Sequence, residues 1–120
     1  MQYIGVDIIE INRIRKAIDR WGLNFLQRVY TDSELELYLN NTSSLAARFS
    51  GKEAVIKTLH SNGIGLKDIE ILPGVKGKPR VKLYGKARHQ AEDMGLINLD
   101  ISLSHCHEYA IACAIGEIKN

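Results

Sequence analysis

Residues 44–60 of the chain read SLAARFSGKEAVIKTLH, and this stretch decides the fold. Apolar side chains recur along it at helical spacing, at Leu45, Phe49, Ile56 and Leu59. Residues three or four positions apart share one face of a helix, so the spacing predicts a long helix with an apolar stripe. The rest of the chain is expected to pack around this helix.

Two elements are predicted near the N-terminus. Residues 2–8 should form a short buried strand, because Ile4, Val6 and Ile8 are β-branched. From Glu10 onward the apolar residues change to helical spacing, which predicts an amphipathic helix ending near Trp21. A basic stripe runs along another side of that helix, formed by Arg13, Lys16 and Arg20.

A second, shorter helix is expected after Thr31. Thr31 followed three positions later by Glu34 is a capping-box pattern, in which the two side chains satisfy backbone groups at a helix start. Residues 40–42 then read as a turn that leads into the long helix. Gly63 lies just beyond the predicted end of the long helix and suits its termination.

The second half of the chain is predicted to be mostly strands. Residues 68–72 and 80–84 alternate in strand fashion across a loop rich in Gly and Pro, and residues 86–94 look helical. Residues 99–105 and 109–115 are joined by only a few residues and should therefore pair antiparallel. The predicted fold class is α+β: a single compact domain over residues 1–120, with a mainly antiparallel sheet packed against the long helix.

Composition limits the classes of function. The net charge of +2 is too small for wrapping of nucleic acid, and no apolar stretch is long enough to cross a bilayer. The first ten residues lack the features of a secretory signal peptide. Of the two cysteines, Cys113 lies in an apolar run where a buried free thiol is expected. These observations predict a reduced protein of the cytoplasm, with neither nucleic acid nor membrane as a partner.

Asp7 stands alone as a carboxylate within an apolar run. A carboxylate that loses hydration needs a cation or hydrogen-bond donors in place of water. Asp7 could cap the helix that starts near Glu10, or it could be a metal ligand. Both interpretations remain open from the sequence.

The long helix carries a second set of polar residues. Ser50, Glu53, Lys57 and His60 share one side of it, and on spacing alone Glu53 and Lys57 could simply form a helical ion pair. If Asp7 meets Glu53, the two carboxylates would suit Mg²⁺ or Mn²⁺ together with substrate phosphate oxygens. Lys57 could then neutralise a departing phosphate.

Other polar residues give weaker signals. Arg48 could bind a phosphate as a bidentate donor or lie solvated on the surface. A hydrolase pair of Ser104 and His105 is disfavoured, because adjacent strand residues point to opposite faces. The strand end near His105 lacks paired zinc-ligand spacing and suits a ligand contact better. Gly63 and Gly65 follow a helix instead of leading into one, so they do not form a phosphate-binding loop.

Four segments of the sequence, taken together, favour one function over the alternatives. These segments are IGVDIIEINRI at the start, ARFSGKEAVIKTL in the middle, GIG after it and ISLSHCHEYAIACAI at the end. Their combination and separation resemble the holo-acyl-carrier-protein synthase family, whose members are small phosphopantetheinyl transferases. The resemblance covers nearly the whole chain and implies the fold of that family.

The resemblance also implies an activity and its residues. It implies transfer of 4'-phosphopantetheine from coenzyme A to a serine of apo acyl carrier protein, with release of 3',5'-ADP, in support of fatty acid biosynthesis. It further implies a homotrimer with active sites between subunits. The implied roles are Mg²⁺ binding by Asp7 and Glu53, catalysis by Glu53 and Lys57, coenzyme A binding by Arg48, His105 and Gly65, and carrier-protein binding by Arg13 and Arg20.

Two other functions use the same residues differently. A magnesium-dependent nucleotide phosphohydrolase would activate water with the two carboxylates, and product analysis distinguishes it from a transferase. A binding module for nucleic acid or a carrier protein would use the basic stripe of the first helix. Its binding would persist when Glu53 is replaced.

Overall fold

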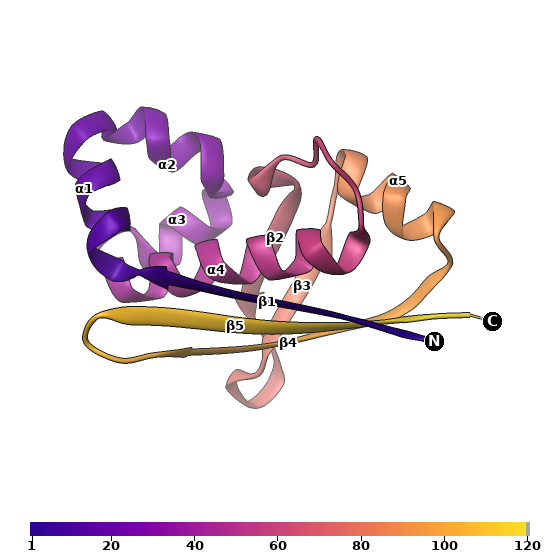
Figure 1. The fold of residues 1–120 in the computed structure, drawn as a ribbon. Helices are drawn as coiled ribbons and strands as arrows, with labels where there is room; N and C mark the ends of the chain where they lie inside the picture. The colour runs from indigo at the N-terminus through magenta and orange to yellow at the C-terminus, as the bar shows by residue number, and fades with distance from the viewer. Residues whose placement is uncertain (120) are drawn as a thin grey trace.

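A long helix lies across one face of a three-stranded sheet in the computed structural model, which describes residues 1–119 (Figure 1). The helices are α1 (Ile11–Trp21), α2 (Leu23–Val29), α3 (Asp32–Tyr38), α4 (Thr42–Leu59) and α5 (Gly85–Asp93). The strands are β1 (Gln2–Glu10), β2 (Ile69–Pro73), β3 (Pro79–Leu83), β4 (Leu96–His105) and β5 (Tyr109–Ile118). Short 3₁₀ turns precede β2 and connect it to β3, at Leu66–Asp68 and Val75–Gly77. The predicted α+β class is confirmed.

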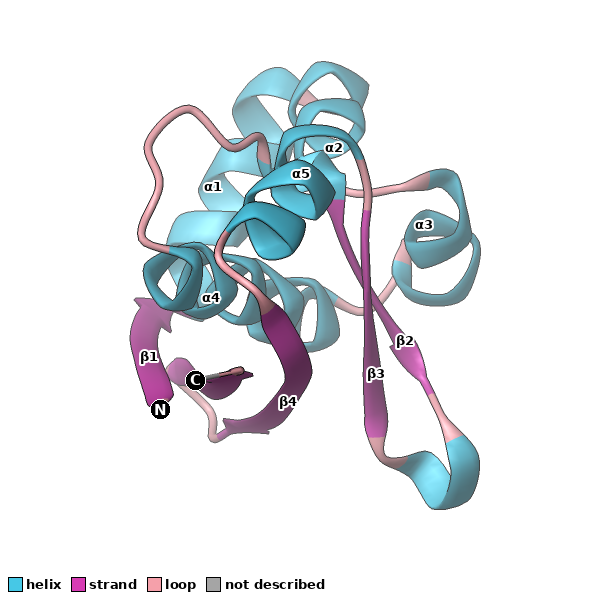
Figure 2. Ribbon diagram, turned by 90° about the vertical axis from the view of Figure 1, so that its right-hand side faces the viewer, coloured by secondary structure: helices cyan, strands magenta, loops and turns pink. Residues whose placement is uncertain are grey.

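Both sheets are antiparallel, as predicted. The larger sheet has the order β1-β5-β4, so the first strand of the chain pairs with the last. Strands β2 and β3 form a separate hairpin beside it, and the view in Figure 2 shows the larger sheet curving beneath α4. The predicted pairing of residues 99–105 with 109–115 is confirmed, and both strands extend beyond those limits.

Small residues allow α4 to approach the sheets closely. A Cβ atom on Gly51 would lie 2.6 Å from Cδ1 of Ile71 on β2, and one on Gly5 of β1 would overlap the carbonyl oxygen of Ala54. Glycine in a helix costs about 1 kcal/mol relative to alanine, so its presence in α4 reflects this packing. The contact brings the polar residues of α4 directly against β1.

The core side of α4 differs in part from the predicted stripe. Leu45 and Leu59 are buried as predicted, but Phe49 and Ile56 are only partly buried. The helix is embedded between the larger sheet, the β2–β3 hairpin and the N-terminal helices, so small and polar residues on its other faces are buried too. A single apolar stripe therefore underestimates how much of this helix is covered.

Strand β1 buries the opposite face from the one predicted. Ile4, Val6 and Ile8 are exposed, whereas Gly5 and Ile9 are buried against the helical side. Successive strand residues point to opposite faces of a sheet, and α4 approaches the face that carries Gly5. The three β-branched side chains therefore lie on the outer face of the sheet, which no helix covers in Figure 1.

The N-terminal helices form a second small core with the start of α4. The capping box at Thr31 is confirmed: Thr31 Oγ1 accepts from Glu34 N, and Glu34 Oε1 accepts from Thr31 N at 2.9 Å. Helix α2 was not predicted, because it follows α1 directly through Gly22 and has no side-chain cap to mark its start.

The ends of α4 also differ from the prediction. It begins at Thr42, two residues earlier than expected, with the Asn41 side chain accepting from Ser44 N at 3.0 Å. It ends at Leu59, where His60 adopts a left-handed conformation, so Gly63 does not terminate it. No helix among the described residues is long and apolar enough to cross a membrane.

Candidate active site

A cluster of polar side chains lies where β1 packs against α4. Ser50 of α4 is buried, and its hydroxyl lies 3.0 Å from Oδ2 of Asp7 and 2.8 Å from the Asp7 carbonyl oxygen. Helix α1 has Glu10 as its N-cap residue and no side-chain capping bond. Asp7 therefore faces α4 and does not cap α1.

Lys57 closes the other side of the Asp7 carboxylate. Its Nζ donates to the carbonyl oxygen of Val6 at 2.7 Å and lies 3.5 Å from Oδ1 of Asp7. The Lys57 side chain is 54% exposed and that of Asp7 is 19% exposed. The ammonium group is thus tethered to β1 yet reachable by a ligand from solvent.

Glu53 adds a second carboxylate to the cluster. Its pKa is raised by partial burial and by the negative charge of Asp7, and Lys57 only partly opposes these effects. A carboxylate whose ionisation is disfavoured by a neighbouring carboxylate favours a cation between the two. Asp7, Ser50, Glu53 and Lys57 come together here from two segments far apart in the sequence.

The donor set fits a hard divalent cation that a substrate helps to bind. No group of three or more His, Cys, Asp or Glu side chains within residues 1–119 is arranged to hold a metal by itself. Mg²⁺ is commonly bound through one or two carboxylates, several waters and substrate phosphates, so the two carboxylates of Asp7 and Glu53 match its preference for oxygen ligands. The raised pKa of Glu53 is the observation that favours a cation here.

Arg48 lies on α4, held against a tyrosine. Its Nη2 donates to the Tyr38 hydroxyl at 2.8 Å, and its guanidinium carbon lies 3.9 Å from the centre of the Tyr38 ring. Its Nε is buried without a hydrogen-bond partner among the described residues. A buried donor without a partner is costly, so Arg48 has capacity left for an anionic ligand.

His105 and Gly65 are not part of the cluster formed by Asp7, Ser50, Glu53 and Lys57. His105 is exposed at the end of β4 and pairs in register with Ala110, which in turn pairs with Ile9. It is therefore two strands away from β1, near the level of Asp7 along the sheet. Gly65 precedes the 3₁₀ turn before β2, has an ordinary backbone conformation and is exposed.

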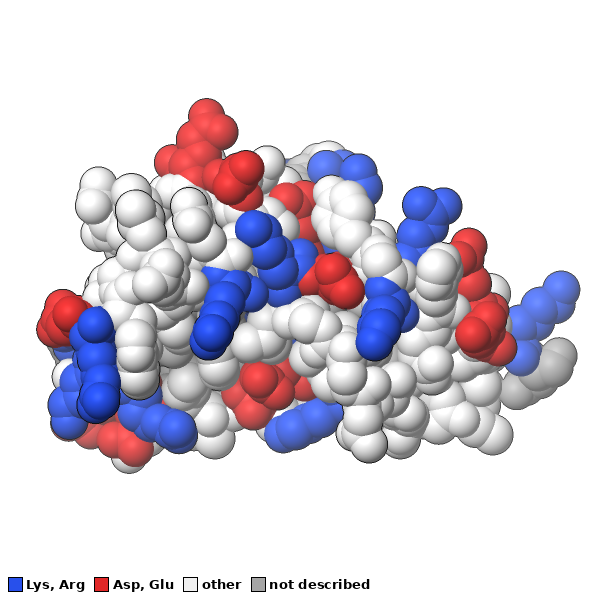
Figure 3. All heavy atoms as spheres, turned by 90° about the horizontal axis from the view of Figure 1, so that it is seen from above, with Lys and Arg blue, Asp and Glu red and all other residues white. Residues whose placement is uncertain are grey.

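Arg13 and Arg20 are both exposed on α1, seven residues and therefore about two turns apart. The guanidinium of Arg20 lies over the Trp21 ring, 4.9 Å from its centre. Figure 3 shows basic and acidic side chains interspersed over the face seen from above, without one broad field of a single sign. A charged partner on this face must therefore be recognised by a small group of charged residues and not by a broad charged surface.

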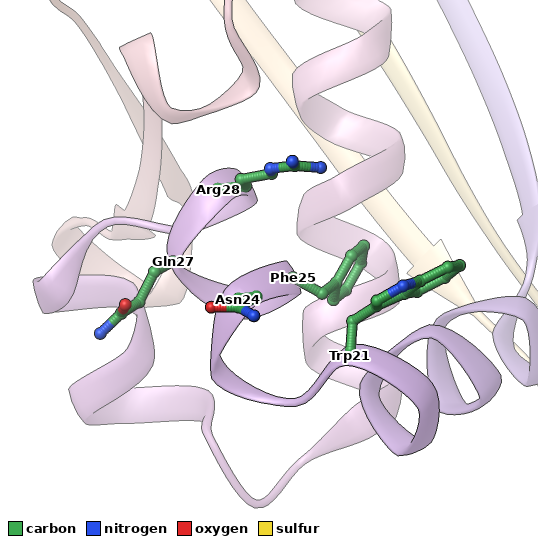
Figure 4. Close-up of a pocket in the computed structure, with 5 residues that line it drawn as sticks. All are labelled: Trp21, Asn24, Phe25, Gln27 and Arg28. Carbon is green, nitrogen blue, oxygen red and sulfur yellow. The ribbon is translucent and has the colours of Figure 1, made fainter.

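A depression on the surface has no lining residue in common with the cluster of Asp7, Ser50, Glu53 and Lys57. It has a volume of about 530 Å³ and adjoins the end of α1 and helix α2 (Figure 4). Its lining residues are Trp21, Asn24, Phe25, Gln27 and Arg28. It offers no carboxylate for a cation, so it does not match the donor set described above.

Sequence reasoning missed a buried ion pair behind the cluster. Lys52 precedes Glu53 on α4 but points to a different side of the helix, where its Nζ lies 2.7 Å from Oε1 of Glu34. Both side chains are completely buried. The two residues are distant in the sequence and on different helices, so no local spacing could reveal their pairing.

The amino-acid sequence matches a model of the 4'-phosphopantetheinyl transferase superfamily over residues 3–114. A protein of Dehalococcoides mccartyi strain CBDB1, named holo-[acyl-carrier-protein] synthase, is 50% identical over 98% of this chain and 99% of its own. A protein of the same name from Moorella thermoacetica is 46% identical over 94% of this chain and 91% of its own.

Solved structures agree in fold. The Helicobacter pylori holo-[acyl-carrier-protein] synthase in complex with coenzyme A superposes with a TM-score of 0.85 at 32% identity, covering 95% of this chain and 99% of the other. A Plasmodium yoelii acyl carrier protein synthase with ADP bound gives a TM-score of 0.89 at 29% identity, covering 100% and 99%. The likeness therefore extends over the whole architecture.

Proposed function

Because this chain belongs to the 4'-phosphopantetheinyl transferase superfamily, we infer that it transfers the 4'-phosphopantetheine group of coenzyme A to a serine of apo acyl carrier protein. In this reaction the serine oxygen bonds to the β-phosphorus of coenzyme A. The bond from that phosphorus to the bridging oxygen breaks, and 3',5'-ADP leaves. The serine proton is released, and the carrier gains a phosphodiester.

The observation that supports an active site in this chain is the meeting of Asp7, Ser50, Glu53 and Lys57 between β1 and α4. In our proposal Asp7 and Glu53 hold Mg²⁺. When bound, the cation would supply Lewis-acid polarisation of the phosphoryl oxygens. The nucleophile belongs to the carrier protein, so the chain needs no nucleophile of its own.

Lys57 and Glu53 have different roles in this proposal. The Lys57 ammonium, tethered to the Val6 carbonyl and half exposed, neutralises charge that develops on the departing 3',5'-ADP. Glu53 accepts the serine proton at a carboxylate oxygen, directly or through a water. A carboxylate has two oxygens, so one can face the cation while the other accepts the proton.

We propose that Arg48, His105 and Gly65 help to bind coenzyme A. The unpartnered Nε of Arg48 supports a role as an anion donor. The position of His105 on the sheet, near the level of Asp7, would place it beside a ligand that reaches the carboxylates. The exposed backbone at Gly65 allows close approach of a ligand.

Metal removal tests this function. Intact-mass spectrometry of an apo acyl carrier protein of fatty acid biosynthesis, incubated with the chain, coenzyme A and Mg²⁺, should show the mass gain of one phosphopantetheine group. EDTA should abolish the gain, and added Mg²⁺ should restore it. Transfer at the same rate in EDTA would contradict the metal role, whereas free phosphate or a hydrolysed coenzyme A without a modified carrier would favour a phosphohydrolase.

We propose that the carrier protein docks on α1 through Arg13 and Arg20. The proposed compartment for this reaction is the cytoplasm. Replacing both arginines by glutamate should raise the KM for carrier protein at least about tenfold, equivalent to 1.4 kcal/mol, because attraction to an acidic partner becomes repulsion. The value of kcat should change little. Arg88→Glu on α5 reverses one charge elsewhere on the surface and serves as the control for charge reversal as such. Equal KM values for the wild type and the double variant would exclude this docking site.

A homotrimer is also proposed, on the basis of the uncovered sheet. Its outer face is apolar, with exposed Ile4, Val6 and Ile8 on β1 and Ile111 and Ile115 on β5. A contiguous apolar face of this kind typically marks a protein interface. Light scattering should give three times the chain mass of 13.5 kDa, and a mass of one chain at micromolar concentration would contradict the trimer.

A further inference from the structure

The hydroxyl group of Ser50 is committed to Asp7. The Ser50 side chain is completely buried, and its Oγ lies within hydrogen-bond distance of both Oδ2 and the carbonyl oxygen of Asp7. A serine hydroxyl carries one proton, so it can donate to only one of these two oxygens at a time. In both arrangements the donor anchors Asp7 to the middle of α4.

The Asp7 carboxylate is consequently held at both of its oxygens. Oδ2 faces the Ser50 hydroxyl at 3.0 Å, and Oδ1 faces the Lys57 ammonium at 3.5 Å. Lys57 is half exposed and belongs to the proposed machinery, so it is free to turn toward a phosphate. When it does, Ser50 is the remaining side chain that fixes the orientation of the carboxylate.

A second buried hydroxyl on α4 shows that a bond to β1, like that of Ser50, is not a general property of buried hydroxyls on this helix. Thr58 is also completely buried and also faces the larger sheet, beside Gly5. Its Oγ1 donates to the Ala54 carbonyl oxygen at 3.0 Å, within its own helix, as threonine in a helix commonly does. Ser50 instead reaches across to β1.

We propose that Ser50 is a positioning residue that aims the Asp7 carboxylate at the cation and the pyrophosphate of the substrate. This inference rests on the proposed metal-binding role of Asp7. Groups that hydrogen-bond to a metal ligand orient it, and their loss typically lowers metal affinity by about 10–100-fold. Ser50 acts entirely through Asp7 and touches neither the substrate nor the cation.

The test compares Ser50→Ala with wild type and with Thr58→Val, which removes the other completely buried hydroxyl of α4. Alanine is the most favourable helix residue, so the Ser50 variant should fold. Two quantities are measured: Mn²⁺ binding in the presence of 3',5'-ADP, by electron paramagnetic resonance, and the Mg²⁺ concentration that gives half-maximal transfer. Melting temperatures are recorded for all three proteins.

Ser50→Ala should weaken Mn²⁺ binding and raise the half-maximal Mg²⁺ concentration by about tenfold or more. Saturating Mg²⁺ should restore most of the transfer rate, which a folding defect would not allow. Thr58→Val should bind Mn²⁺ within about twofold of wild type even if its melting temperature falls, since its hydroxyl bonds only within its own helix. Wild-type metal affinity in Ser50→Ala would overturn the positioning role.

The same experiment separates this inference from the function on which it rests. Asp7→Asn is included, and it should lose metal binding and transfer together. Wild-type protein that binds Mn²⁺ while Ser50→Ala binds it equally well would sink the role of Ser50 alone. Wild-type protein that neither binds Mn²⁺ nor depends on Mg²⁺ would overturn the proposed metal site as well.

Discussion

The Glu53→Gln variant is expected to transfer phosphopantetheine at least about 100-fold more slowly than the wild type. Glutamine keeps the size of the side chain, but its neutral amide neither balances a divalent cation nor accepts the serine proton. The rate is measured by intact mass of the carrier protein at saturating coenzyme A and Mg²⁺. Glu36→Gln, at an exposed position of α3, is the matched control and should keep the wild-type rate.

The stability of Glu53→Gln should change in the opposite direction from its activity. The pKa of Glu53 is higher in the folded protein than its ordinary value, so folding disfavours the charged carboxylate. Its charge therefore lowers the free energy of unfolding once the pH exceeds the unfolded pKa, and the full effect is present above the folded pKa. A neutral glutamine removes this cost at pH 7, and the variant should be at least as stable as the wild type in metal-free buffer. A wild-type rate of transfer in Glu53→Gln would contradict the proposed catalytic and metal-binding roles of Glu53.

The Lys52→Met variant should show the largest loss of stability, about 3–5 kcal/mol in the free energy of unfolding. Lys52 Nζ donates to Oε1 of Glu34 and to the carbonyl oxygens of Leu66 and Ile69. Burial lowers the pKa of Lys52, and the charge of Glu34 opposes that effect and favours the ammonium form. Removing the ammonium leaves the buried Glu34 carboxylate without a counter-charge, although Thr31 N and Ile71 N still donate to it, and it takes a donor away from two carbonyl groups.

Urea unfolding followed by circular dichroism measures this loss, with Lys86→Met at an exposed position of α5 as the control. The double variant Lys52→Met, Glu34→Gln should recover part of the stability, because it removes the uncompensated charge as well. A Lys52→Met variant within about 1 kcal/mol of wild type would show that the buried pair does not stabilise the fold.

The fold could be predicted where one segment carries its own signal. The capping box at Thr31 and Glu34, the spacing of α4 and the short link between β4 and β5 each act within a few residues. The buried face of β1 could not be predicted, because it depends on where α4 lies. An outer face of isoleucine and valine looks like a core strand when the sequence is considered alone.

The site was predictable in its residue types and less so in its contacts. Asp7 and Glu53 could be paired as a hypothesis because two carboxylates that meet suit Mg²⁺, and the structure places the charge of Asp7 close enough to raise the pKa of Glu53. Ser50 was recognised as sharing a side of the helix with Glu53, but its bond to Asp7 spans 43 residues. Contacts of this range depend on how β1 is laid against α4.

The most direct test of the proposed site is the position of a bound metal. Crystals of the chain grown with Mn²⁺ and 3',5'-ADP would be measured with X-rays at the manganese absorption edge, where anomalous scattering identifies the ion. The proposal predicts one strong peak within coordination distance of carboxylate oxygens of both Asp7 and Glu53, with a phosphate oxygen completing its contacts. A nucleotide bound in the crystal with no peak between these two carboxylates, or with the peak elsewhere, would contradict it.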